Sequence, residues 1–181
     1  MKINQPIQFL ANFWKLSIGN ILRINLMGAR LEDIYNFIQL SDRIATAGQP
    51  TVVQYPAIAS AGYQTVINLA LKESANALPD EAAIAANLGL EYIQIPVVWD
   101  APTLENFQEF VRVMNASEDR KVFVHCAANM RVSAFMYLYR QLQNLVDEET
   151  ARVDLAKIWV PNEVWQTFIE QNLTPQPPSL D

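Results

Sequence analysis

The feature that most constrains this chain is the alternation, beyond residue 40, of short apolar runs with segments of helical periodicity. Four runs have the length and composition of strands, and the last three are dense in Val and Ile: residues 43–46, 65–69, 92–97 and 122–125. Strands that alternate with helices along a chain form parallel sheets covered by helices. The sequence therefore predicts an α/β fold with a mostly parallel sheet of four to five strands.

Helical patterns fill the intervals between and after these runs. They are expected after Pro50, then over residues 79–89, 103–114, 130–138, 147–158 and 161–171. Thr103 is a candidate N-cap for the third of these helices, whose apolar residues recur at helical spacing. Pro56 lacks the N–H that a helix interior requires, so the first helix is predicted to be short or irregular.

Length and composition favour a single domain. A chain of 181 residues is within the size of one domain, and 51% hydrophobic with only 18% charged residues excludes a disordered chain. Residues 42–173 are predicted to form the α/β domain, with residues 1–41 as a helical arm packed on it and residues 174–181 as a loose tail. The arm has four basic residues and no acidic residue before Glu32, so it is also a candidate for contact with a partner or a membrane surface.

Charge and residue counts exclude several functions. The net charge of -6 argues against binding to nucleic acid, which requires a basic surface. One Cys and one His exclude an internal disulfide and the usual zinc sites, and we expect neither a metal nor another cofactor. Glycine, proline and polar residues interrupt the uncharged stretch from Ile44 to Leu71, so no transmembrane segment is predicted and a cytoplasmic location is expected.

The residues that best suit chemistry surround the single cysteine. Cys126 follows the last apolar run and precedes a predicted helix. Amide N–H groups of such a loop and the positive end of the helix stabilise a thiolate and bind an anion. Arg131, a planar bidentate donor, follows closely and suits the oxygens of a phosphate. The segment therefore predicts an anion-binding cradle, and the residues between Cys126 and Arg131 are Ala127, Ala128, Asn129 and Met130.

This segment resembles the active-site motif of the cysteine-dependent protein tyrosine and dual-specificity phosphatases, in which His-Cys is followed by five residues and an arginine. Residues 42–140, and particularly residues 45–51, 61–63, 66–69 and 125–133, are similar to the phosphatase-like domain of beta-lactamase hydrolase-like proteins. The resemblance implies a fold like that of dual-specificity phosphatases. It also implies hydrolysis of phosphomonoesters, on a phosphotyrosine-like or small-molecule substrate, through a cysteinyl-phosphate intermediate.

The resemblance assigns a role to each residue of the motif. Cys126 is the nucleophile, and Arg131 with the loop amides binds the phosphate. Asp100, which lies 26 residues before the cysteine, is the general acid. His125 orients the cysteine, and Ser133 contacts the phosphate and helps to expel the thiolate.

The loop departs from the phosphatase motif, because only four residues separate Cys126 from Arg131 and Val132 stands at the position of the motif's arginine. One residue of offset rotates a helical side chain by about 100°, so Arg131 either points elsewhere or belongs to a tighter cradle. Asn129 stands where the motif usually has glycine, and asparagine tolerates left-handed backbone better than most residues.

Two alternatives follow from the shorter loop. Rhodanese-type sulfurtransferases have a loop of similar length, so sulfur transfer through a persulfide on Cys126 is the first. The second is a binding module that holds a phosphorylated ligand without catalysis.

Overall fold

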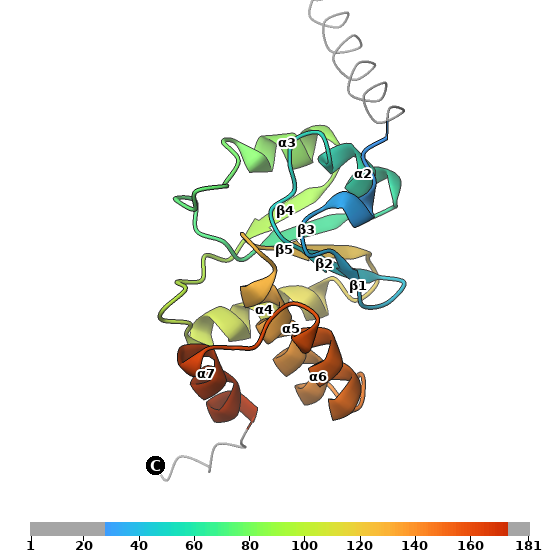
Figure 1. Ribbon diagram of the computed structural model, residues 1–181. Coiled ribbons are helices and arrows are strands. Elements are labelled where there is room, and N and C mark those ends of the chain that lie inside the picture. The colour runs from blue at the N-terminus through green and yellow to red at the C-terminus, as the bar shows by residue number, and fades with distance from the viewer. Residues whose placement is uncertain (1–27, 174–181) are drawn as a thin grey trace, which may run out of the picture.

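The computed structural model describes residues 28–173, in which a five-stranded sheet lies between two layers of helices (Figure 1). The strand order is β1-β2-β5-β3-β4. β1 pairs antiparallel with β2, and the other strands run parallel. The strands are β1 (Ile38–Gln39), β2 (Ile44–Ala47), β3 (Thr65–Asn68), β4 (Glu91–Gln94) and β5 (Val122–His125). The predicted α/β class and mostly parallel sheet are confirmed.

Each predicted helical interval contains a helix. A short 3-10 helix, η1 (Leu31–Asp33), precedes α2 (Tyr55–Ser60), α3 (Glu81–Asn87), α4 (Leu104–Ala116), α5 (Met130–Leu142), α6 (Glu148–Ala156) and α7 (Glu163–Leu173). The Thr103 side chain caps α4 by accepting the N–H of Asn106, as predicted. Pro56 lies in the first turn of α2, where its missing N–H costs no helical hydrogen bond, and the helix is short.

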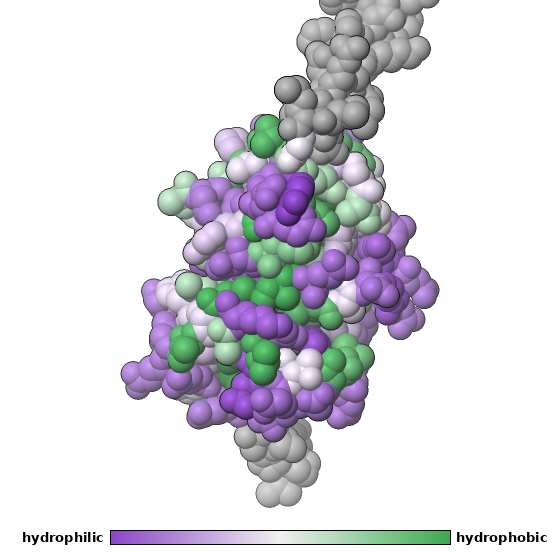
Figure 2. Space-filling model, turned by 45° about the vertical axis from the view of Figure 1, so that its right-hand side comes forward, coloured by the Kyte–Doolittle hydropathy of each residue, from purple (hydrophilic) through white to green (hydrophobic). Residues whose placement is uncertain are grey.

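Two hydrophobic cores hold the layers together. One lies between the sheet and the layer of α4, α5 and α7, where the Phe135 ring contacts those of Phe107, Phe110, Trp165 and Phe168. The other lies between the sheet and the layer of α2 and α3. All residues of β3 and β5 are buried, as strands covered on both faces must be. Hydrophilic residues predominate on the face in Figure 2, around a smaller apolar area.

The sheet begins earlier than the sequence predicted. The predicted α/β domain starts at residue 42, whereas β1 places Ile38 opposite Thr46 at the edge of the sheet. A two-residue strand has too short a pattern to be recognised from its residues alone. Residues 1–27 of the predicted arm and the predicted tail, residues 174–181, lie outside the described residues. Within residues 28–173, the helices are too short or too polar to cross a bilayer.

Candidate active site

The candidate site lies at the carboxyl edge of the parallel strands. The register places Ala47 at the end of β2 and Asn68 at the end of β3 on either side of His125, the last residue of β5. Cys126 follows directly and is fully buried. The carboxyl ends of parallel strands meet at one edge of a sheet, which is where α/β proteins bind ligands. The loop after Cys126 is therefore surrounded by the loops that follow β2 and β3.

Neighbouring segments hold the carbonyl groups of the loop after Cys126. The Ala127 carbonyl accepts the N–H of Gln49 at 3.3 Å and the side-chain amide of Asn76 at 3.0 Å. The Ala128 carbonyl accepts the Asn36 side-chain amide at 3.0 Å. In a trans peptide the next N–H points away from the carbonyl, and the Ala128 N–H has no acceptor among the described residues. This N–H is therefore available to an anion.

Asn129 turns the loop into α5. Its φ of 66° confirms the left-handed backbone expected of this position. Its side chain is fully buried, and Nδ2 donates to the Asn36 carbonyl at 2.7 Å and to the Thr46 hydroxyl at 3.0 Å. The first turn of the helix that follows leaves N–H groups without helical partners, which favours an anion at this end.

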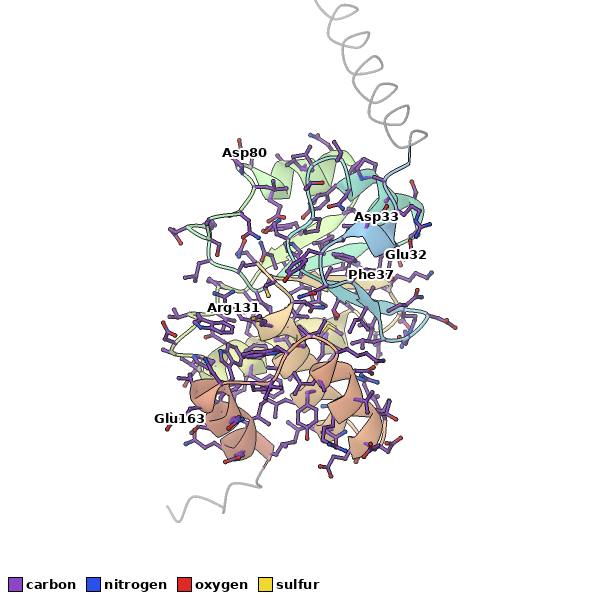
Figure 3. The ribbon with its side chains drawn as sticks, viewed as in Figure 1. Glu32, Asp33, Phe37, Asp80, Arg131 and Glu163 are labelled. Atoms are coloured by element: carbon purple, nitrogen blue, oxygen red, sulfur yellow. The ribbon has the colours of Figure 1, made fainter. Side chains whose placement is uncertain are left out.

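Arg131 lies in the first turn of α5 (Figure 3). It is 8% exposed, and its guanidinium carbon lies 5.4 Å from the centre of the Trp99 ring. Its buried Nε has no hydrogen-bond partner, and no carboxylate of the described residues pairs with it. A guanidinium held against an aromatic face and left without a counter-charge is suited to a bound anion.

The segment that carries Asp100 is attached to α7. The Trp99 carbonyl accepts the indole N–H of Trp165 at 3.0 Å, and the Trp99 ring contacts those of Trp159 and Trp165. Trp99 thus joins the Asp100 segment to Arg131. Asp100 itself is exposed, and its carboxylate makes no hydrogen bond or ion pair with the described residues.

Ser133 lies one turn into α5 and is buried. Its hydroxyl donates to the Met130 carbonyl at 2.9 Å and accepts the indole N–H of Trp159 at 3.1 Å. Side-chain bonds of this kind hold the hydroxyl in a defined orientation. Met130, Ala127 and Ala128 are half-buried, so the loop reaches the surface between the buried Cys126 and the buried Arg131.

His125 is fully buried beside Glu81, a residue that the sequence reading did not select. The imidazole Nε2 lies 3.4 Å from Glu81 Oε1. Burial lowers the pKa of His125 to about 4, although the Glu81 charge acts in the opposite direction. The sequence reading also missed Asn36 and Asn76, which hold the loop from distant segments. No local signal marks these residues, because polar residues are ordinary in helix starts and loops.

Comparisons with known proteins identify the family of this chain and relatives of its fold. Residues 17–167 match the family described as DSP-PTPase phosphatase fused to NAD+ kinase. A beta-lactamase hydrolase-like protein of Xylella fastidiosa is 31% identical over 97 residues, which are 52% of this chain and 22% of the relative. The match covers only about a fifth of the length of this Xylella fastidiosa relative, and a second strain's protein gives the same figures.

Solved structures share the fold. A DUF442 protein of Shewanella putrefaciens CN-32 is similar with a TM-score of 0.71 and 29% identity, over 78% of this chain and 93% of that one. TpbA of P. aeruginosa, solved in complex with pTyr, has a TM-score of 0.59 and 15% identity, over 74% of this chain and 82% of that one. At that identity the likeness to TpbA concerns the fold alone.

Proposed function

Since this chain belongs to the family of dual-specificity-type phosphatases described as fused to NAD+ kinase, we propose that it hydrolyses phosphomonoesters through a cysteinyl-phosphate on Cys126. The observation that carries this proposal is the buried guanidinium of Arg131, which pairs with no carboxylate of residues 28–173 and lies in the helix turn that follows the cysteine loop. Such a guanidinium provides two parallel donors for two phosphate oxygens. The free Ala128 N–H adds a donor from the loop.

The reaction proceeds in two displacements. The Cys126 thiolate attacks phosphorus, and the bond from phosphorus to the leaving oxygen breaks as that oxygen takes the proton of Asp100. Water then attacks the cysteinyl phosphate, Asp100 takes a proton from the water, and the thiolate leaves with release of inorganic phosphate. Arg131 and the loop amides stabilise the charge on the equatorial oxygens in both steps.

The remaining residues of the cradle position these groups. The Arg131 guanidinium lies over the face of the Trp99 ring, and Asp100 is the residue that follows Trp99 in the chain. Asn129 fixes the turn between the loop and α5, and Ser133 is assigned the role of assisting the departing thiolate, which is the role that the family motif gives this position. Ala127, Ala128 and Met130 offer amide groups rather than polar side chains, so the cradle recognises the phosphate and not the group that carries it. Phosphotyrosine-like esters and small phosphorylated molecules are both substrates of the proposed class.

Turnover of p-nitrophenyl phosphate between pH 5 and 8 tests this proposal. Cys126→Ser should abolish turnover while circular dichroism shows an intact fold. Asp100→Asn should lower kcat by about 10² to 10⁴ if this carboxyl is the general acid. Unchanged activity in Cys126→Ser would overturn the mechanism.

The four-residue loop keeps sulfur transfer as a second candidate, and mass spectrometry separates it from phosphate hydrolysis. Incubation with thiosulfate should leave no labile adduct of one sulfur atom on the wild-type protein, and phosphate ester should be turned over. A persulfide on Cys126 together with an absence of phosphatase turnover would replace the proposal by a sulfurtransferase. Phosphate binding without turnover or persulfide would indicate a binding module.

A further inference from the structure

A buried cluster of polar side chains lies beside the end of β5. Its centre is Glu81, the first residue of α3, which follows Asp80 (Figure 3) and is 6% exposed. Glu81 Oε1 accepts the Tyr55 hydroxyl at 2.8 Å and the Gln49 side-chain amide. Glu81 Oε2 accepts the Asn68 amide at 2.8 Å, and the Tyr92 hydroxyl lies 2.9 Å from Glu81 Oε2 and 2.6 Å from Gln94 Oε1, so its single proton serves one of the two acceptors at a time. Both carboxyl oxygens of Glu81 therefore lie among neutral hydrogen-bond donors.

The two tyrosines keep their protons and remain donors. Burial raises the pKa of Tyr55 and of Tyr92, and the Glu81 charge raises both further. Neither Lys nor Arg of the described residues lies within ion-pair distance of Glu81. A buried carboxylate held only by neutral donors costs free energy of desolvation, and a hydrophobic residue would avoid that cost. The cluster therefore calls for a role beyond packing.

The fifth neighbour of Glu81 is His125, which precedes Cys126. Glu81 Oε1 lies 3.4 Å from the imidazole Nε2, a close approach of the carboxyl group to the ring that does not meet hydrogen-bond geometry. Burial lowers the pKa of His125 to about 4, so the imidazole is neutral near pH 7 and carries one proton. The partner of one ring nitrogen decides which nitrogen holds that proton. Glu81 faces Nε2 and favours the proton there, and the Cys126 backbone, which also interacts with the imidazole, is the competing influence.

We propose that Glu81 is a positioning residue for the reaction: its carboxylate keeps the proton of His125 on Nε2 and thereby fixes the imidazole at the end of β5, one residue before Cys126. This inference rests on the proposed role of Cys126 as the nucleophile. The backbone supports the same end of the strand, because the His125 carbonyl accepts the Leu69 N–H at 2.9 Å and the Cys126 N–H donates to the Ala47 carbonyl at 3.4 Å. Glu81 adds to this support through the side chain of His125, the residue that precedes Cys126.

Nitrogen NMR of the histidine tests the contact directly, because the chain has a single His and therefore gives one imidazole pattern. Full-length protein labelled with ¹⁵N should show the neutral tautomer with the proton on Nε2 at pH 7. Glu81→Gln should lose this preference. A wild-type protein with the proton on Nδ1, or an unchanged tautomer in Glu81→Gln, would overturn the inference.

Kinetics with p-nitrophenyl phosphate then test the positioning role. Misplacement of a reacting group by about 1 Å can cost about 100-fold, so Glu81→Gln should lower kcat by up to that factor and change KM less. Glu105→Gln is the matched control, because Glu105 also lies in the first turn of a helix but is exposed; it should change neither kcat nor the tautomer. If Glu81→Gln does not fold, Glu81→Asp, which withdraws the carboxylate by one methylene, should lower kcat in the same way.

The outcomes separate this inference from the proposed function. Cys126→Ser should lose turnover and keep the Nε2 proton, because the nucleophile does not determine the tautomer. An altered tautomer with unchanged kcat in Glu81→Gln would overturn the positioning role and leave the phosphatase mechanism standing. Faster alkylation of Cys126 by iodoacetamide in Glu81→Gln would also overturn it, because the charge of Glu81 would then oppose the thiolate rather than position it.

Discussion

Asn129 contributes to the cradle in two ways, once through its backbone and once through its side chain. Its backbone adopts a φ of 66°, which reverses the chain into α5, and its amide donates to the Asn36 carbonyl and the Thr46 hydroxyl. Glycine at this position would provide only the backbone contribution. The local sequence predicted the left-handed backbone, whereas the two amide bonds depend on residues more than 80 positions away.

Substitution of Asn129 separates these two contributions. Asn129→Gly and Asn129→Ala lose the same amide bonds, but only alanine pays for the left-handed backbone. The free energy of unfolding should therefore be lower for Asn129→Ala than for Asn129→Gly by about 1–2 kcal/mol. Urea denaturation of both variants measures the difference. Equal stabilities would mean that the loop relaxes to a different backbone.

Gly48 allows the loop after β2 to approach the cradle. A Cβ at this position would lie 3.0 Å from the Tyr35 carbonyl oxygen and 3.2 Å from the Ala127 carbonyl oxygen. Gly48→Ala should displace the Ala127 peptide, lower kcat/KM by about tenfold or more, and cost about 1–3 kcal/mol in unfolding free energy. Steady-state kinetics and urea denaturation measure the two effects.

Gly62→Ala is the control for this substitution. Gly62 has a φ of +84°, so alanine is strained there, but the nearest atom, on the Lys121 side chain, is 3.9 Å away. This variant should lose stability and keep kcat/KM. A Gly48→Ala enzyme with wild-type kinetics would show that the Ala127 carbonyl does not set the geometry of the cradle.

Elements with a strong local pattern were predicted well, and elements set by pairing were not. β5 has the predicted bounds, since four buried residues in succession form a clear apolar run. The run predicted over residues 92–97 corresponds to β4, which starts one residue earlier and ends at Gln94, although the Ile95 and Val97 N–H groups still donate to the Asn68 and Leu69 carbonyls. β1 escaped prediction because its two residues are held by their partners in β2 and not by a pattern of their own.

Helix α7 supports the segment that carries the proposed general acid. Trp165 is fully buried, and its indole N–H donates to the Trp99 carbonyl at 3.0 Å. Trp165→Phe should remove this bond while keeping an aromatic ring in the core. One hydrogen bond is worth about 1 kcal/mol, so kcat should fall roughly fivefold if Asp100 depends on it. Hydrolysis of p-nitrophenyl phosphate measures the change.

Tyr139→Phe, in α5, is the control for Trp165→Phe. The Tyr139 hydroxyl donates to Asn115 at 3.1 Å, in a part of the molecule away from Asp100. Its loss should lower the free energy of unfolding by a similar amount, about 1 kcal/mol, and leave kcat unchanged. Equal kcat in Trp165→Phe and the wild type would show that α7 does not hold the Asp100 segment in its working position.

At the scale of the whole molecule, the site combines residues of two kinds. Cys126 and Arg131 are close in sequence, so their chemistry was visible in one short segment. Asn36 and Asn76 reach the same loop from 92 and 51 positions away, and only the tertiary fold brings their segments together. Glu81 was passed over because an acid at a helix start is common, and its burial depends on the packing of distant elements.

Because the chain has a single histidine, a pH dependence of its free energy of unfolding near pH 5 to 6 can be assigned to that residue. Burial lowers the pKa of His125 from 6.5 to about 4, so between these values the unfolded chain binds a proton that the folded protein excludes. Stability is thus fully present above about pH 6.5 and falls as the pH approaches 4. Urea denaturation at pH 7 and pH 5 should show a loss of about 2 kcal/mol from this group. His125→Gln keeps the carboxyl groups that titrate in the wild type, so its free energy of unfolding should fall by about 2 kcal/mol less over the same pH interval. Equal losses in the two proteins would mean that folding does not lower the pKa of His125.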